Sequence, residues 1–446
     1  MNPDFIKSLE TSLGGDVCER FLEAQDSPVT VSVRRNPSKL ESLSKIFPEV
    51  EPVPWCTDGA YLEHRPVFAL DPLFHAGAYY VQDAASMAVG ALFERFAKPG
   101  IRVLDLCAAP GGKTTHLLSA MSSDSLLVAN EVISQRATVL AENVTKWGKS
   151  NVVVTSCDPS EFARLGGYFD IIVADVPCSG EGMFRKDDGA VEQWSPDNVA
   201  LCAARQKRII SDVWNSLKEG GILIYSTCTF NTYENDSNVS WVCSELGAEV
   251  VECEDFPETK GNVPLRTLCG FQFVPGITRG EGQYCAVLRK TKGVGAPFRR
   301  PKSSKVKIVS CGWISQNYQA VETVTSSKEI LLKAYPKELM ADMTALEDSL
   351  KCLRSGVAVA SMKGKDLIPQ AALALSVGVM ATGAFREAGI SKEQALAYLR
   401  LQPIVLPDFP KGFVLVTYGG IPLGFVKNLG NRTNNLFPTA WRLRMG

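Results

Sequence analysis

From residue 101 to residue 227, short β-rich apolar runs alternate with longer stretches of helical pattern. The runs occupy residues 101–106, 125–130, 151–155, 170–175 and 222–227. This alternation predicts a mostly parallel sheet flanked by helices, because parallel neighbours need a crossover connection, usually a helix. We therefore expect a doubly wound α/β fold, in which ligands bind outside the carboxyl ends of the strands.

The first run leads into a glycine-containing loop, DLCAAPGGKTTHL at 105–117, and a helical pattern follows. Backbone N–H groups at such a helix N-terminus face whatever binds there. A GxGxxG motif is absent. A Walker A loop fits in part, since Gly112, Lys113 and Thr114 match, but Cys107 stands where the first glycine belongs. Phosphate binding is disfavoured, and a nucleotide-binding ATPase stays open as an alternative.

An acidic residue follows or ends each of the next three runs. Glu131 lies about twenty residues beyond the glycines, where doubly wound sheets place a ribose-binding carboxylate. Asp158 follows the third run, and Asp175 ends the fourth. A buried strand requires apolar residues but gives no reason for an acid at each carboxyl end. We therefore interpret the three acids as ligand-binding residues.

Two cysteines follow the last two runs, Cys178 in DVPCSGEGMFRKD and Cys228 in YSTCTF. If the runs ending at Asp175 and Tyr225 form neighbouring strands, about 4.8 Å apart, the loops after them share one edge of the sheet. We therefore expect both thiols over the same crevice. A thiolate there would be a good nucleophile.

The motifs CAAPGGKT, DVPCSG and YSTCT together resemble those of the Sun-family RNA cytosine-5 methyltransferases. The chain is most similar to the bacterial RsmF-type rRNA enzymes, also at YVQDAASM (80–87) and GEGQYCAVL (280–288). The resemblance implies a class I methyltransferase fold with S-adenosylmethionine as cofactor. By the family pattern, the cofactor-binding residues are Cys107, Ala108, Ala109, Pro110, Gly111, Gly112, Lys113, Glu131, Asp158 and Asp175.

The same resemblance assigns the chemistry. Carbon 5 of cytosine is a weak nucleophile, so the family first adds a thiolate to carbon 6, and here Cys228 would do so. Cys178 would assist release of the product, and Asp175 would contact nitrogen 3 of the base. DNA cytosine methyltransferases use the Pro-Cys cysteine as nucleophile and lack the later one, so the presence of both favours RNA.

A base inside a duplex is out of reach of such a crevice, so the target must be unpaired or flipped. Phe184, Arg185 and Lys186 follow Cys178 closely, and we expect them to hold the base and its phosphate. One position departs from the family. Gly276 follows Pro275 where the family commonly has a histidine. We expect this departure to affect the positioning of the substrate and not the cofactor or thiol motifs.

Charge is distributed unevenly along the chain. Residues 289–446 hold 23 Lys and Arg against 10 Asp and Glu, an excess of +13, and residues 1–288 hold 24 against 38, an excess of −14. Such asymmetry is expected when one module binds a polyanion, although a solvated basic face is the alternative. The basic segment 291–307 reads as an exposed linker, with Arg299 and Arg300 as phosphate contacts.

The final residues, LGNRTNNLFPTAWRLRM, resemble the PUA-like RNA-binding tail of the RsmF type. Arg432, Arg442 and Arg444 offer charge, and Trp441 offers a surface on which unpaired bases stack. Trp441 could equally fill the core of the small domain.

These patterns divide the chain into five parts: an α+β module at 1–98, a catalytic domain at 99–290, a linker at 291–307, a mainly helical module with some β at 308–389 and a PUA-like domain at 390–446. The uncharged stretch Leu367–Phe385 is long enough to span a membrane but contains Pro369 and many small residues, so we expect a buried helical segment.

Thirteen cysteines lie without CxxC or His/Cys ligand spacing, and there are three histidines, so no metal site is expected. The start MNPDFIKSLE has no secretory pattern. We therefore expect a cytoplasmic, monomeric protein with reduced thiols, bound to RNA and not to membranes. Small-subunit rRNA is the expected substrate, with tRNA as an alternative and a poorly catalytic ribosome assembly factor as another.

Overall fold

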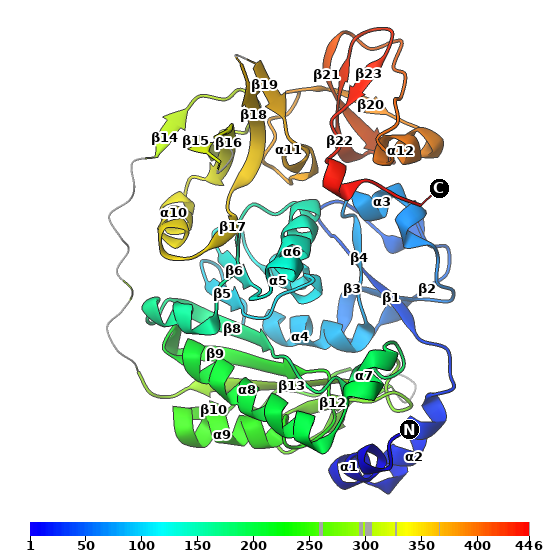
Figure 1. The fold of residues 1–446 in the computed structure, drawn as a ribbon, viewed down its shortest axis with the longest axis vertical. Coiled ribbons are helices and arrows are strands. Elements are labelled where there is room, and N and C mark those ends of the chain that lie inside the picture. Colours follow the sequence, from blue (N-terminus) through cyan, green and yellow to red (C-terminus); the bar gives the residue numbers. More distant parts are fainter. Residues whose placement is uncertain (258–261, 294–297, 299–305, 326–327, 365, 446) are drawn as a thin grey trace.

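The computed structural model describes residues 1–257, 262–293, 298, 306–325, 328–364 and 366–445. Its strands form four sheets that follow one another along the chain (Figure 1). Arg299 and Arg300, proposed as phosphate contacts, lie outside the described residues, as does much of the linker 291–307.

The N-terminal module is α+β, as the sequence predicts. Its sheet is antiparallel with strand order β2-β3-β1-β4, and the predicted TVSVRR strand is β1. The elements are α1 (Pro3–Leu13), α2 (Gly15–Ala24), β1 (Val31–Arg35), η1 (Leu43–Lys45), β2 (Val50–Val53), β3 (Cys56–Leu62), η2 (Phe68–Leu70), α3 (Pro72–His75), β4 (Tyr79–Val81) and α4 (Ala84–Glu94).

The central sheet contains all five predicted strands, now β5 (Arg102–Asp105), β6 (Leu126–Asn130), β7 (Val152–Thr155), β8 (Phe169–Asp175) and β9 (Leu217–Thr227). They are mutually parallel in the order β7-β6-β5-β8-β9. Antiparallel strands extend the β9 edge. The further elements are α5 (Gly112–Ala120), α6 (Ser134–Trp147), η3 (Pro159–Arg164), η4 (Glu181–Met183), α7 (Asp188–Gln193), α8 (Pro196–Trp214), α9 (Asp236–Leu246), β10 (Ala248–Val250), β11 (Leu265–Arg266), β12 (Phe271–Phe273) and β13 (Gln283–Lys290).

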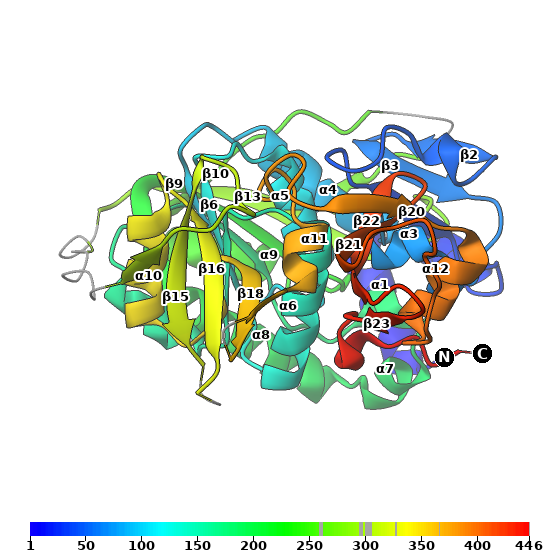
Figure 2. The same cartoon turned by 90° about the horizontal axis from the view of Figure 1, so that it is seen from above.

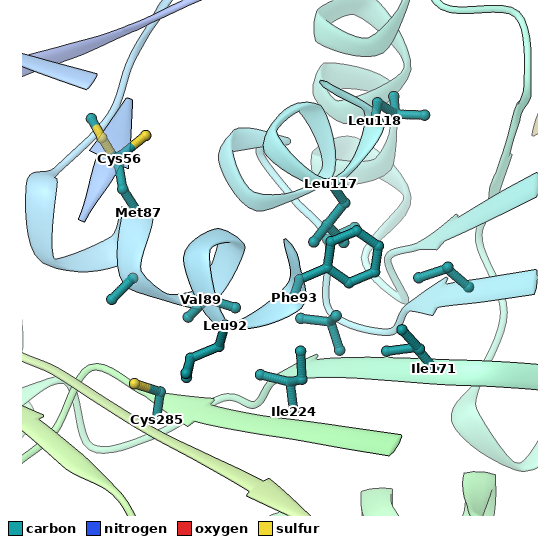
Figure 3. Packing of buried hydrophobic residues seen from close by; sticks show 14 of the residues in the cluster. Cys56, Met87, Val89, Leu92, Phe93, Leu117, Leu118, Ile171, Ile224 and Cys285 are labelled. Carbon is teal, nitrogen blue, oxygen red and sulfur yellow. The ribbon is translucent and has the colours of Figure 1, made fainter. Parts of the chain in front are cut away.

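Helices cover both faces of this sheet, because its strands are apolar on both sides. One core packs α4, α5 and α6 against the sheet, and the other packs α8 and α9. Figure 3 shows Leu92 and Phe93 of α4 lying against Ile224 and Ile171 of the sheet. Helix α4 therefore joins the N-terminal module to the catalytic sheet.

The next module is mainly β, and the prediction of a mainly helical module is wrong. Its antiparallel sheet has the order β14-β15-β16-β18-β19. One short strand, β17, leaves this module and pairs with β7 at the edge of the central sheet. The elements are β14 (Lys307–Val309), β15 (Tyr318–Val324), β16 (Ile330–Pro336), α10 (Met340–Ser349), β17 (Cys352–Arg354), β18 (Val357–Lys363), β19 (Asp366–Pro369) and α11 (Ala371–Leu375).

The expected helical segment Leu367–Phe385 is also wrong. Its start belongs to β19, which pairs with β18, and only α11 is helical. Pro369 ends the strand, and the small residues after α11 form turns. No helix in the described part of the chain is long and apolar enough to cross a membrane.

The C-terminal sheet has the order β20-β21-β22-β23 and begins at Arg386, four residues before the predicted boundary at 390. Its elements are β20 (Arg386–Gly389), α12 (Lys392–Leu399), β21 (Gly412–Tyr418), β22 (Ile421–Asn428), β23 (Thr433–Asn435) and η5 (Thr439–Trp441). Seen from above, it lies beside α3 (Figure 2). Val33, Leu62, Tyr398 and Val414 share one buried core, so the two ends of the chain pack on each other.

This shared core generates a prediction about the N-terminal sheet. A chain truncated to residues 1–384 removes the apolar cover of β1, and each buried Val or Leu side chain stabilises by about 1.5–3 kcal/mol. We expect amide hydrogen exchange in β1 to accelerate by at least about tenfold while exchange in β8, the internal control, changes little. Mass spectrometry of the exchanged peptides measures both, and unchanged protection of β1 would contradict the shared core.

Candidate active site

A buried arginine from the N-terminal module holds the glycine loop. Gly111 has φ 115°, a left-handed conformation that glycine adopts without strain, and α5 begins at the next residue. Arg34 is fully buried and donates to Gly112 O at 3.1 Å and to Thr115 Oγ1 at 2.6 Å. Its guanidinium lies 4.7 Å from the centre of the Trp147 ring. Burial lowers the pKa of Arg34 to about 10, so the cation persists at neutral pH.

Other carbonyls of the loop face α6. Ala109 O accepts from Arg136 at 3.1 Å, and Pro110 O accepts from Asn143 at 2.8 Å. Burial raises the pKa of the Cys107 thiol, so Cys107 keeps its proton and contributes to the loop through its backbone. The loop predicted from the sequence is therefore fixed by side chains from two directions.

Asp105, at the end of β5, was missed among the predicted ligands. It is fully buried, and its Oδ2 accepts from Thr114 Oγ1 at 2.6 Å. Its Oδ1 is buried without a hydrogen-bond partner among the described residues. Burial raises the pKa of Asp105 to about 7, Thr114 acts against the rise, and Asp175 adds to it. The available signal was the acid one residue before the end of the first run, in IRVLDL.

Glu131 and Asp158 lie at the ends of the next two strands. Glu131 is nearly buried, accepts from Ile133 N at 2.9 Å and has Arg136 at 3.4 Å. Asp158 is 43 % exposed and caps η3 by accepting from Ser160 N at 3.1 Å. The hydrogen bonds from Ser160 lower the pKa of Asp158. Asp158 has a local structural task, and its cofactor role stays a prediction.

Asp175 forms an ion pair with Lys113 at 2.8 Å and accepts from Ser226 Oγ at 2.7 Å. Burial acts to lower the pKa of Lys113, but the charge of Asp175 and, farther away, that of Cys228 raise it above its ordinary value. A Walker A loop needs its lysine and hydroxyl free for phosphate and metal. Here Lys113 and Thr114 are engaged with aspartates, which argues against an ATPase.

The structure brings the two cysteines together, as expected from the strand order. Cys178 and Cys228 follow β8 and β9, which pair in parallel, and their sulfur atoms lie 3.2 Å apart. Both are free and half-buried. The hydrogen bond with Cys228 and burial raise the pKa of Cys178 well above its ordinary value. Cys178 therefore keeps its proton at neutral pH.

Two facing glycines let the motif loops approach each other. Gly182 N donates to Cys228 O at 2.7 Å. A Cβ added to Gly182 would lie 2.7 Å from the Gly282 Cα and 2.8 Å from Cys228 O, closer than real Cβ contacts. The second glycine of SGEG and the second glycine of GEGQY are therefore required by packing around the Cys228 loop.

The expected base-holding trio is corrected by the structure. Phe184 is buried against Phe5, with ring centres 4.8 Å apart. Arg185 is 7 % exposed and donates to Ser27 O and Pro28 O at 3.1 and 2.9 Å. Both residues fasten the loop to the N-terminal segment. Lys186 is paired with Asp83 at 3.0 Å, but its side chain is 29 % exposed. Of the three residues, it is the one that RNA could still contact.

The C-terminal candidates have different surroundings. Arg432, Arg442 and Arg444 are exposed. Trp441 is half-buried, 6.1 Å from the Phe437 ring, and Lys146 of α6 lies 5.4 Å from its ring centre. It therefore contributes to a core, and its stacking role stays a prediction.

Gly276 has a structural role in this chain. Its φ is 85°, and an added Cβ would lie 2.3 Å from Arg20 O in α2. The Arg20 side chain donates to Gly276 O at 2.7 Å. The family's histidine could not occupy this position without moving α2. No group of three or more His, Cys, Asp or Glu residues suited to a metal occurs within the described ranges.

Three family models match the chain in order. Residues 1–84 match the N-terminal domain of 16S rRNA methyltransferase RsmF, residues 97–289 match 16S rRNA methyltransferase RsmB/F, and residues 385–443 match the methyltransferase RsmF PUA domain. The third match starts where the C-terminal sheet starts.

Curated proteins are similar over nearly the whole length. The ribosomal RNA small subunit methyltransferase F of Klebsiella pneumoniae (strain 342) is 34 % identical over 94 % of this chain and 91 % of its own. The protein of that name from Shewanella sp. (strain MR-7) is 33 % identical over 98 % and 96 %.

Solved structures resemble about two-thirds of the chain. A methyltransferase homologue from Pyrococcus horikoshii is 25 % identical with a TM-score of 0.54, covering 65 % of this chain and 100 % of its own. NSun6 from the same organism, crystallised with SFG, is 20 % identical with a TM-score of 0.55, covering 65 % and 98 %.

The thiol pair generates a prediction about alkylation. Changing Cys228→Ala removes the largest cause of the raised Cys178 pKa, so the midpoint of the pH profile for alkylation of Cys178 should move to lower pH. Iodoacetamide labelling at several pH values, followed by mass spectrometry of the Cys178 peptide, measures this midpoint. Greater access alone changes the rate without moving the midpoint, and an unmoved midpoint would contradict the hydrogen bond.

Proposed function

Because the chain belongs to the RsmF-type family of 16S rRNA methyltransferases, we propose that it transfers a methyl group from S-adenosylmethionine to carbon 5 of a cytosine in small-subunit rRNA. The observation that carries this proposal is the thiol pair, with sulfur atoms of Cys178 and Cys228 3.2 Å apart at the carboxyl ends of neighbouring parallel strands. Two thiols in one crevice suit a reaction that must both make and break a bond between enzyme and base.

The residues at the glycine loop fit S-adenosylmethionine, which carries an ammonium and a sulfonium. Asp105 has a buried carboxylate oxygen without a partner among the described residues, and Glu131 is a nearly buried carboxylate at the next strand end. Asp105 would hold the ammonium, Glu131 the ribose, and backbone groups of 107–113 the rest. SFG, found with the NSun6 protein, is an analogue of this cofactor. When bound, the cofactor supplies the methyl group.

Cys228 begins the reaction by adding as a thiolate to carbon 6 of the base. Lys113 is the cation of the neighbouring cofactor loop, paired with Asp175 at 2.8 Å. Addition places negative charge on the ring. Asp175, 30 % exposed beside Lys113, would contact the nitrogen 3 edge. To stabilise the negative charge there it must donate a hydrogen bond, which it does as a carboxyl that has taken up a proton. Positioned acid–base groups of this kind contribute about 10² to 10⁴-fold.

Release is the task of Cys178. After methyl transfer, a base takes the proton from carbon 5, and the carbon 6–sulfur bond breaks with its electron pair returning to Cys228. Cys178 is within hydrogen-bond distance of the sulfur that must leave. Its retained proton can stabilise the departing thiolate, and we propose that Cys178 acts at this step.

The C-terminal domain supplies a second contact with RNA. It matches a PUA domain, it belongs to the part of the chain with an excess of +13, and Arg432, Arg442 and Arg444 are exposed on it. Phosphate contacts of this kind give affinity that falls with salt. The relatives named for the small ribosomal subunit favour rRNA over tRNA. We propose that the protein acts as a cytoplasmic monomer.

Covalent trapping tests the assignment of the two thiols. Incubated with S-adenosylmethionine and small-subunit rRNA, Cys178→Ala should accumulate a protein–RNA adduct on a denaturing gel, because release fails. Cys228→Ala should form no adduct and lose at least about 10³-fold in methyl transfer, since the covalent route is closed. Cys243→Ala, on α9, is the control and should match the wild type.

An adduct with Cys228→Ala and none with Cys178→Ala would reverse the two roles. Methyl transfer to tRNA and none to rRNA would replace the substrate, and S-adenosylmethionine binding without transfer to either would favour an assembly factor. Bisulfite mapping of RNA from a deletion strain then identifies the cytosine.

The pKa of Asp105 generates a prediction about cofactor affinity. Because the Asp105 pKa is raised to about 7, the carboxylate is largely protonated at pH 6 and largely ionised at pH 7.5, with Lys113, Asp175 and Glu131 as its charged neighbours. Affinity for S-adenosylmethionine should therefore rise by about fivefold across this interval, which stays below the pKa of about 7.7–8.0 at which an α-amino group loses its charge. Calorimetry measures it, and Asp105→Asn should bind weakly with no such rise. An equal pH dependence in the variant would remove Asp105 from the cofactor site.

A further inference from the structure

Two buried glutamates cross between the loops that carry the thiols. Glu181 lies three residues after Cys178, and its carboxylate reaches the Cys228 loop. Its Oε2 accepts from Phe230 N at 2.7 Å and from Asn231 N at 3.0 Å. Its Oε1 accepts from the side chains of Trp194 and Asn231 at 2.9 and 3.0 Å. Glu181 therefore orders the backbone that follows Cys228.

Glu234 makes the reverse contact. It lies six residues after Cys228, and its Oε2 accepts from Ser179 N, the residue after Cys178, at 3.1 Å. The same oxygen accepts from Gln206 Nε2 at 2.7 Å, and Oε1 accepts from Asn231 Nδ2 at 2.9 Å. Each cysteine loop thus supplies a carboxylate to the backbone of the other loop.

The two carboxylates are not part of a charge pair. Glu181 is 2 % exposed and Glu234 is fully buried, and neither forms a salt bridge within the described residues. The partners named above are all N–H groups. Hydrogen bonds to a charged acceptor are stronger than those between neutral groups, and a buried carboxylate without them is strongly unfavourable. Both loops are therefore held in one arrangement.

We propose that Glu181 and Glu234 are positioning residues, a reciprocal clasp that holds Cys178 and Cys228 close enough to act on the same base. This inference rests on the proposed methyl transfer for its catalytic consequence, but the geometry of the thiol pair can be tested without it. A displacement of about 1 Å in a reacting group can cost about 10²-fold in rate. The two glutamates would therefore contribute to catalysis by positioning the loops, without contacting the base.

Glutamine tests the clasp because it preserves size. Both oxygens of each carboxylate accept from N–H groups. Whichever way the amide of Glu181→Gln or Glu234→Gln is turned, its NH₂ therefore faces another donor and a hydrogen bond is lost. The matched control is Glu192→Gln, an exposed acid on α7. If Glu181→Gln fails to fold, Trp194→Phe removes a single donor to the same carboxylate and carries the test.

The first readout is the rate at which diamide, which takes two hydrogen atoms from a thiol pair, joins Cys178 to Cys228. We expect at least about tenfold slower crosslinking in both glutamine variants and no change in Glu192→Gln. The second readout is kcat, expected to fall about 10²-fold with the cofactor Kd and the RNA KM within about twofold of the wild type.

Folded variants that crosslink and turn over within about twofold of the wild type would overturn the clasp. A proportional loss of cofactor binding, RNA binding and kcat would also overturn it, because that pattern indicates general unfolding. If the wild type itself methylates no RNA, the proposed function fails, while the crosslinking rates still decide whether the clasp positions the thiols.

Discussion

The parallel pairing of β8 with β9 decides where the chemistry lies. Asp175 is opposite Ser226 in the register, and Val176 N donates to Ser226 O at 3.0 Å, so the pairing continues to the point where both chains leave the sheet. Neighbouring strands lie about 4.8 Å apart. Two loops that start so close, with a cysteine two or three residues on, bring the sulfur atoms together. A slip of the register would separate the thiols, whatever else the crevice contained.

Local pattern was sufficient to predict this part of the fold. The runs that became β5 to β9 are apolar on both faces because helices cover both sides of the sheet, and such runs can be read from the sequence without knowing their partners. Cys178, Cys228 and Asp175 lie where these runs end, so the edge of a parallel sheet was sufficient to group them. The same logic would have added Asp105 if the first strand had been ended one residue earlier, where β5 ends.

What could not be read depends on partners distant in sequence. Arg185 carries the charge expected of a phosphate contact, but the carbonyls of Ser27 and Pro28 occupy it. Leu367–Phe385 has helical composition, but pairing of β19 with β18 overrides that local preference. Glu181 and Glu234 look like ordinary loop acids, because their donors become visible only when the two loops meet. Each error follows from a tertiary contact that outweighs a local signal.

The modules around the sheet act as one support for the crevice. Arg34 reaches from the N-terminal sheet into the first turn of α5, and the C-terminal domain packs on that same sheet and, through Trp441, on Lys146 of α6. A buried apolar core resists relative motion far better than a linker does. Under the proposed function, the C-terminal domain that binds RNA is therefore held at a fixed position relative to the thiol pair. The distance along the RNA between the gripped phosphates and the methylated cytosine is then set by the fold, which makes the shape of the RNA part of target selection.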